Sequence, residues 1–409
     1  MGFSEQIKFL SKLIQYGPVY GSEGQLKTAK AIENQLNEFG WDRVWLQKFK
    51  ADDLSSIHEY IPVSNLSSNY IKDANKEKLN VIAIADSGKP GPTLILNGHY
   101  DVEPIIDSSD WIESWNSGLI KNGKIWGRGA SDMLGGLTSQ IYIASEFARQ
   151  KKKWKGKIIF TAVTDEEIGG NGTLSALLFM RSKGLINDSE NTYCLIAEPS
   201  NQVIANETLG FMHMIIKVSG LARHIAGATR YDNALYSAIE LINEFDKVIE
   251  EITKMHGTPK NDMIYNFGVI KGGVDAATPI DSISLEATVF YPSNIEYEKL
   301  KRFIIDQIQK KNIRLSIRFS DFYFNGQRSP SNSLSRALIH TTPNKGIVMG
   351  KFNSPCDARL FDAFGIKNVI TYGPGSLAQA HTVNEFIKIE NIEEYNTHIA
   401  GALKLLLKE

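Results

Sequence analysis

The sequence predicts an α/β protein: an open sheet flanked by helices, with a smaller ferredoxin-like α+β unit inserted into it. Nearly continuous apolar runs alternate with helical patterns in the first half of the chain, as expected for a sheet covered on both faces. The order then changes to strand, helix, two strands, helix, strand, before the first pattern returns. A chain of 409 residues is also too long for one ordinary core, so we expect two domains.

The composition is that of a globular protein without a strong charge. Hydrophobic residues make up 42%, charged residues 22%, and the net charge of -1 argues against a nucleic-acid or membrane-surface partner. No apolar stretch reaches the roughly 18 residues of a membrane span, and the N-terminus is typical of an amphipathic helix, not of a signal peptide. Cys194 and Cys356 are far apart and fit a reducing compartment. We therefore expect a cytoplasmic enzyme of small molecules.

Helical spacing of apolar residues opens the chain and recurs between short runs rich in Val, Ile, Leu and Phe. The segment 51–77 has no clear period and is predicted to be a long surface excursion. We predict helices at 9–13, 29–39, 137–147 and 174–183, and strands at 80–86, 93–99, 157–164 and 192–198.

The pattern changes near residue 210, where an insertion of ~110 residues, an ordinary domain size, begins. The predicted organisation is a larger domain in two parts, 1–206 and 321–409, around an inserted domain at 207–320. In the inserted domain we predict strand 210–220, helix 233–252, strands 266–273 and 282–292, helix 297–310 and strand 313–322. After it we predict helices at 334–341, 357–364 and from 389, and strands at 346–350 and 368–373.

Polar residues gather where strands of the larger domain end, which is where ligands bind in open α/β sheets. Carboxylates packed this closely would repel one another and shift their pKa values, and a divalent metal removes that conflict. Nitrogen and oxygen ligands without cysteine suit zinc, and manganese or cobalt less specifically. The set comprises His99 and Asp101 after strand 93–99, Asp132 before helix 137–147, Asp165, Glu166 and Glu167 after strand 157–164, Glu198 at the end of strand 192–198, and His381 in a late loop.

Each of these residues also has a simpler interpretation. Asp132 could cap the helix that follows it, and Glu166 with Glu167 could be a solvated pair in a loop. Glu198 could be a surface residue held by the next proline, while His99 and His381 could make ordinary polar contacts. All of these interpretations must hold together for the metal site to be absent.

Five motifs carry a resemblance to a known family. The stretches "NGHYDVEP", "WGRGASDMLGG", "TDEEIGGNGT", "AEPS" and "GPGSLAQAHTVNEF" resemble the co-catalytic dizinc amidohydrolases and peptidases. That family includes acetylornithine deacetylase, succinyl-diaminopimelate desuccinylase, aminoacylase and glutamate carboxypeptidase. The motifs stand in family order over most of the chain, and together they are highly specific.

The resemblance implies two Zn²⁺ per chain, with Co²⁺ or Mn²⁺ as alternatives, and a zinc-peptidase-like sheet with an inserted dimerisation domain. His99 would bind one ion with Glu198, and His381 the other with Glu167, while Asp132 would bridge the two. Asp101 would accept the other imidazole N–H of His99. Glu166 would be the general base. His224, in "VSGLARHIAGA", would stabilise the oxyanion in the active site of the other subunit of a homodimer.

The match departs from the family where relatives hold the substrate. Leu134 stands where the family has Lys, Ala276 or Ala277 where it has Asn, and Val289 where it has Arg, so the usual N-acyl-α-amino-acid substrate is in question. "SPCDARLF" keeps Arg359, which could bind a carboxylate or form a surface ion pair at a helix start. His224 could also be an ordinary surface histidine after a strand, but the motif around it favours the functional role.

The implied activity is hydrolysis of an amide bond in a small N-acylated amino acid or amine by a zinc-bound hydroxide, as in a deacetylase or desuccinylase. A dipeptidase or carboxypeptidase of the same family is the alternative. A non-hydrolytic metal-containing binding protein is a third reading, but such a protein has no need of a base at Glu166.

Overall fold

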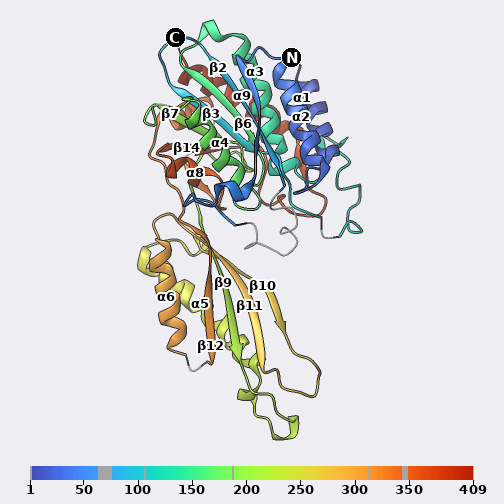
Figure 1. Cartoon of the computed structure of the whole chain (residues 1–409), viewed down its shortest axis with the longest axis vertical. Coiled ribbons are helices and arrows are strands. Elements are labelled where there is room, and N and C mark those ends of the chain that lie inside the picture. Colours follow the sequence, from blue (N-terminus) through green and yellow to red (C-terminus); the bar gives the residue numbers. More distant parts are fainter. Residues whose placement is uncertain are drawn as a thin grey trace. The chain divides into compact units, whose positions relative to one another are not determined.

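The computed structural model describes residues 2–62, 76–105, 107–186, 188–311, 313–342 and 349–408 (Figure 1). The chain divides into two compact units. The larger unit comprises Met1–Glu207, Arg328–Phe352 and Cys356–Glu409, and the smaller comprises Thr208–Gln327 with Asn353–Pro355. Among the described residues, no helix has the length and the hydrophobicity needed to cross a membrane.

The larger unit is built on a mixed eight-stranded sheet. Its centre is parallel, because β6, β3, β7 and β14 run in one direction. At one side, β2 pairs antiparallel with β6, and β1 pairs antiparallel with β2. In sheet order the strands are β1 (Arg43–Phe49), β2 (Lys78–Asp86), β6 (Lys157–Val163), β3 (Thr93–His99), β7 (Thr192–Ile196), β14 (Asn368–Thr371), β8 (Ala205–Thr208) and β13 (Gly350–Phe352).

Two apolar cores lie on opposite faces of this sheet, which explains the unbroken apolar runs of its strands. In β3, Leu94 and Leu96 belong to one core and Ile95, which points the other way, belongs to the second. The first core takes in α1 (Phe3–Tyr16), α2 (Glu23–Asn37), α3 (Gly135–Arg149), α7 (Ser333–Thr341) and α9 (Ile389–Leu406), and the second α4 (Asn171–Ser182) and α8 (Ala358–Ala363).

The predicted fold class is confirmed, and the differences from the predicted elements are local. The sequence analysis missed β1, β8 and a small sheet of β15 (Phe386–Lys388), β5 (Lys124–Trp126) and β4 (Leu119–Lys121). Of the predicted excursion at 51–77, residues 51–54 form the short helix η1 (Ala51–Leu54), and 63–75 lie outside the described residues. Most of the predicted strand 346–350 also lies outside them.

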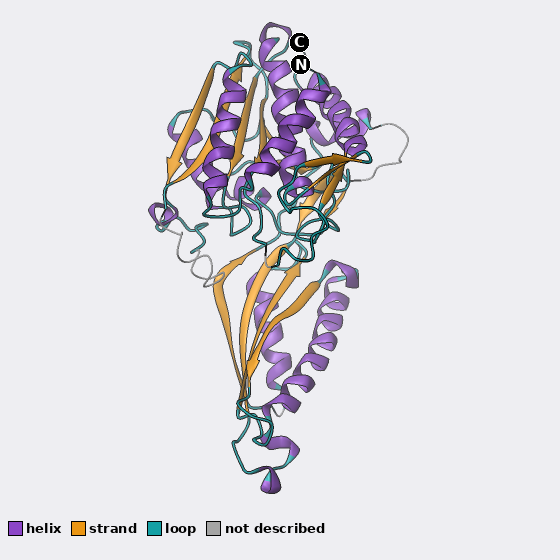
Figure 2. Ribbon diagram, turned by 90° about the vertical axis from the view of Figure 1, so that its right-hand side faces the viewer, coloured by secondary structure: helices purple, strands orange, loops and turns teal. Residues whose placement is uncertain are grey.

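The smaller unit has the ferredoxin-like order expected from the sequence. Its strands pair antiparallel in the order β10-β11-β9-β12. Alternate residues of β9 and β11 are buried, so one face of this sheet packs against its two helices, which Figure 2 shows on a single side. The elements are β9 (Gly210–Ser219), α5 (Ala234–His256), β10 (Ile264–Gly272), β11 (Ser282–Tyr291), α6 (Tyr297–Gln309) and β12 (Leu315–Phe324).

Candidate metal centre

The predicted ligands meet at the carboxyl ends of neighbouring parallel strands in the larger unit. His99 is the last residue of β3, and β6 ends just before the loop that carries Glu166 and Glu167. On the other side of β3, β7 ends two residues before Glu198. The parallel register aligns these three strand ends, so the segments that follow them lie side by side. This is the edge at which open α/β sheets bind ligands.

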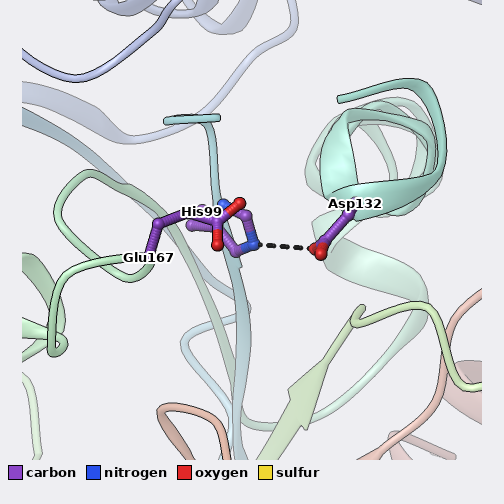
Figure 3. A group of neighbouring side chains, drawn as sticks. All are labelled: His99, Asp132 and Glu167. Atoms are coloured by element: carbon purple, nitrogen blue, oxygen red, sulfur yellow. Dashed lines mark hydrogen bonds and ion pairs between the residues drawn. The ribbon is translucent and has the colours of Figure 1, made fainter. Parts of the chain in front are cut away.

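Asp132 stands between the two histidines. Its Oδ1 lies 3.2 Å from Nε2 of His99, and its Oδ2 lies 3.4 Å from Nε2 of His381. Figure 3 shows the first of these contacts, with Glu167 nearby. Each carboxylate oxygen of Asp132 therefore faces a different imidazole, which is the arrangement a bridging ligand requires.

Each histidine also has a carboxylate of its own. Oε2 of Glu167 lies 3.1 Å from Nε2 of His381, and Oε2 of Glu198 lies 3.8 Å from Nε2 of His99. Oε2 of Glu166 is 4.0 Å from the same nitrogen of His99. The donor atoms of His99, Glu166 and Glu198 all lie within 4.8 Å of one another, close enough to share one ion.

The simpler interpretations of these residues do not agree with the geometry. Asp132 does not cap α3, because that helix begins at Gly135 with Leu134 as its N-cap. Glu198 is only 4% exposed, so it is not a surface residue. The side chains of Glu166 and Glu167 are 16% and 9% exposed, so they are not a solvated pair either.

Asp101 contacts His99 through its main chain. Nδ1 of His99 lies 2.9 Å from the backbone carbonyl of Asp101, whereas the expected partner, the carboxyl oxygen Oδ1, is 3.7 Å away. Because a carbonyl oxygen only accepts, this contact places a proton on Nδ1 and leaves Nε2 to face Asp132. The carboxylate of Asp101 instead accepts the amide N–H of Glu167 at 3.4 Å.

The carboxylates of this cluster carry more negative charge than its two histidines can balance. Burial raises the pKa of Glu166 well above its usual value, and the charge of Glu198 adds to the rise. Burial likewise raises the pKa of Glu198 to about 7 despite the neighbouring His99. Oε1 of Glu198 and Oδ1 of Asp101 are buried and find no hydrogen-bond partner among the described residues. A divalent cation with nitrogen and oxygen ligands fits this set of donors.

The pKa values of the two histidines are raised, whereas burial alone lowers the pKa of an imidazole. Burial alone would lower the pKa of His381, but Glu167 and Asp132 outweigh it and raise that pKa to about 12. Burial also opposes the charged form of His99, yet Glu198 and Asp132 raise its pKa well above the usual value. The carboxylates around both imidazoles therefore favour positive charge at this place.

One residue of this cluster escaped the sequence analysis. A carboxylate oxygen of Glu103 lies within 4.8 Å of donor atoms of Glu167 and His381. A signal was present, because Glu103 stands two residues beyond Asp101, just as Asp101 stands two beyond His99. The signal was weak, since β3 has already ended at His99 and strict alternation no longer applies.

A buried ion pair holds the start of the loop that carries Glu166. Lys78, at the beginning of β2, pairs with the carboxylate of Asp165 and also donates to the hydroxyl of Tyr20 at 3.0 Å. The side chains of Lys78 and Asp165 are 5% and 0% exposed. Asp165 has a left-handed φ of 63°, which is uncommon for a residue with a side chain. The pair therefore fixes a strained backbone next to the predicted base.

Arg359 and His224 lie in different units. Arg359, in α8, donates from Nη2 to the carbonyl of Gly169 at 2.6 Å, within the Glu166 loop. Burial lowers its pKa, while nearby carboxylates that include Glu166 oppose that effect. His224 is an exposed residue of the smaller unit, where its Nδ1 accepts from the amide of Ala226 at 3.3 Å.

The fold and the cluster are those of a metal-dependent hydrolase, and the comparison with protein families specifies which. The family model described as peptidase family M20/M25/M40 matches residues 95–405, so the chain belongs to this family. Members of the family are hydrolases that act on amide bonds, and this chain is therefore an amide-bond hydrolase.

Individual relatives agree in sequence and in fold. Succinyl-diaminopimelate desuccinylase of Vesicomyosocius okutanii subsp. Calyptogena okutanii is 26% identical over 332 residues, 78% of this chain and 85% of that protein. An M20 family metallo-carboxypeptidase of Sulfolobus solfataricus has the same fold at 17% identity, with a TM-score of 0.72 over 98% of this chain and 99% of that one.

Two further solved structures share the fold. Human carnosine dipeptidase 1 is 14% identical, with a TM-score of 0.71 over 99% of this chain and 96% of that one. A Bacillus subtilis protein named as a dinuclear metal binding peptidase of the M20 family is 14% identical, with a TM-score of 0.59 over 99% of this chain and 98% of that one.

Replacing Lys78 by Met should destabilise the larger unit by about 3–5 kcal/mol, because the carboxylate of Asp165 would lose its buried partner. The free energy of unfolding in urea measures this loss. As a control, Lys367 forms an ion pair with Asp362 on the surface, and Lys367→Met should cost about 0–1 kcal/mol. Equal losses in the two variants would show that the buried pair does not have the role assigned to it.

Proposed function

We propose that this chain hydrolyses the amide bond of a small N-acylated amino acid or amine in the cytoplasm, as a deacetylase or desuccinylase does. The site would hold two divalent metal ions, with zinc as the first choice and cobalt or manganese as alternatives. His99 and Glu198 would hold one ion, and His381 and Glu167 the other, with Asp132 shared between them. A dipeptidase or carboxypeptidase activity at the same site is the alternative.

The observation that carries the proposal is the position of Asp132 between the two imidazoles, with a further carboxylate beside each. A set of donors in two halves that share one carboxylate suits a pair of metal ions. When bound, two such ions supply Lewis acidity, which lowers the pKa of water and polarises a carbonyl oxygen.

Glu166 is the residue proposed to move protons. It lies 4.0 Å from Nε2 of His99 and is largely buried, and burial raises its pKa well above the usual value. A carboxylate with a raised pKa is a stronger base at neutral pH, so Glu166 can take a proton from water and return it to the leaving amine. Asp101 would act as a positioning residue, because its main chain orients His99.

The substrate would differ from that of relatives with a polar substrate pocket. Leu134 is fully buried in the apolar core of the larger unit, and Val289 is fully buried in that of the smaller. Neither position therefore offers the polar contact that the family pattern has there. We propose Arg359 as the remaining carboxylate-binding group, because its guanidinium lies beside the loop of Glu166.

A substrate screen tests the reaction. Purified protein loaded with Zn²⁺ should release free amine from at least one of the acetyl-, succinyl- and formyl-amino acids, and faster than it cleaves dipeptides. The rate of amine release measures the activity. Cleavage of dipeptides alone would replace the proposed deacylase by a peptidase, and release from none of these compounds would refute the proposed substrate class.

Replacing Glu166 by Gln should abolish most activity but keep the metal. Positioned acid–base groups contribute about a hundred- to ten-thousand-fold in rate, and we expect a loss at or above the top of that range. Bound zinc, measured by elemental analysis, should stay near two ions per chain, as in the unmodified protein. The matched variant Glu167→Gln should instead weaken one metal site, with partial rescue by added zinc. The assigned roles would be wrong if both variants lost metal alike.

We also propose a homodimer formed through the smaller unit, in which His224 of one copy would meet the oxyanion in the site of the other. The exposure of His224 and the prevalence of two-fold symmetric oligomers support it. Sedimentation at micromolar concentration should give a dimer. His224→Ala should lower kcat and leave bound zinc unchanged. A fully active monomer would refute this arrangement.

A further inference from the structure

Glu385 is a fully buried carboxylate that is not among the proposed metal ligands, yet it collects four hydrogen bonds. Its Oε1 accepts the amide N–H groups of Ser131 at 2.8 Å and of Asp132 at 3.1 Å. Its Oε2 accepts the amide N–H of Gly129 at 3.1 Å and Nη1 of Arg128 at 2.9 Å. One side chain thus satisfies three main-chain donors in the segment that ends at the bridging Asp132.

The small sheet explains how Glu385 reaches that segment. β15 and β5 pair antiparallel, with Phe386 opposite Trp126, and the amide of Gly127 donates to the carbonyl of Glu385 at 2.9 Å. The chain segments that follow β5 and precede β15 therefore start from adjacent positions. Strand pairing thus places Glu385 beside the turn that follows β5. In this way it reaches Asp132, although the two residues are more than 250 positions apart in the sequence.

Arg128 connects the same carboxylate to the other histidine ligand. Its side chain is 7% exposed, and besides Glu385 it reaches two main-chain carbonyls. Nη2 donates to the carbonyl of His381 at 3.2 Å, and Nη1 donates to that of Thr382 at 3.3 Å. The main chain of His381 needs such support, because its φ of 60° lies in the left-handed region, which is unfavourable for a residue other than glycine.

We propose that Glu385 and Arg128 are positioning residues of the metal centre: Glu385 fixes the main chain of Asp132, and Arg128 fixes that of His381. The inference rests on the proposed function, since it assigns both residues to a site for metal ions. Groups that orient metal ligands are commonly worth 10- to 100-fold in metal affinity.

The charge of Glu385 is what suits it to this place. Four donors converge on two oxygens, so both oxygens must accept. A glutamine has the same shape, but its amide nitrogen can only donate and would face either the Arg128 side or the Ser131 side. In Glu385→Gln, the amide nitrogen would therefore face other donors and repel them, and the substitution would leave no cavity.

The experiment is a titration of metal-free protein with Zn²⁺ in competition with a chromophoric chelator, which gives an affinity for each equivalent. Glu385→Gln should weaken both equivalents by about 10- to 100-fold, because Asp132 belongs to both halves of the site. Arg128→Lys keeps the positive charge but loses the two guanidinium nitrogens that donate to separate carbonyls. It should therefore weaken mainly the binding of the Zn²⁺ ion held by His381. Thermal unfolding and circular dichroism of each variant confirm the folded state.

Arg181→Lys is the matched control. Arg181 also donates to a main-chain carbonyl, that of Phe364 at 2.6 Å, but it belongs to α4 and contacts none of the proposed ligands. This control should keep both Zn²⁺ affinities, even where its melting temperature falls.

Three outcomes separate the possibilities. Weaker Zn²⁺ binding in the Glu385 and Arg128 variants, but not in the Arg181 variant, supports the inference. Unchanged affinities in folded Glu385→Gln and Arg128→Lys, with two equivalents bound by the unmodified protein, overturn the inference and leave the proposed function intact. Absence of Zn²⁺ binding by the unmodified protein overturns the proposed function and this inference with it.

Discussion

The site depends on the burial of several carboxylates against two imidazoles at one edge of a parallel sheet. Charges taken out of water at such short distances are costly unless opposite charge is close by. The two histidines offer at most part of that charge, and the raised pKa values of Glu166 and Glu198 show the remaining conflict. The proposed pair of divalent cations would remove this conflict, and Asp132, with one carboxylate oxygen toward each imidazole, is placed where it could contact both ions.

Two residues at this cluster have strained main chain, one a proposed ligand and the other next to the predicted base. Asp165 and His381 both have left-handed φ values, which cost of order 1–3 kcal/mol each for residues with a side chain. Each is held by a buried cation from elsewhere in the chain: Lys78 forms an ion pair with Asp165 itself, and Arg128 donates a hydrogen bond to the carbonyl of His381. The rigid surroundings thus maintain a geometry that the local sequence alone would not prefer.

The sequence was sufficient to predict the fold class and to select candidate ligands that the fold brings together. His99 and Glu198 stand at the ends of apolar runs, so strand direction alone places them at one edge. Glu385 and Lys78 could not be found this way. Glu385 reaches Asp132 through the pairing of two three-residue strands, and Lys78 begins a strand that runs antiparallel to its neighbour. Such contacts depend on topology: Glu385 stands in the motif that also carries His381, but the motif does not show that its side chain reaches the segment of Asp132.

The groups proposed for hydrolysis lie together, whereas the positions linked to substrate binding do not. The proposed ligands and the proposed base lie within a few ångströms of one another in a single unit. The positions where relatives would recognise substrate are here filled by apolar residues, Leu134 and Val289, which pack into two separate cores. Packing keeps these residues in place whatever the substrate is. The chain thus keeps the groups proposed for hydrolysis, and in this proposal recognition comes from other side chains, among which Arg359 contacts the loop of Glu166.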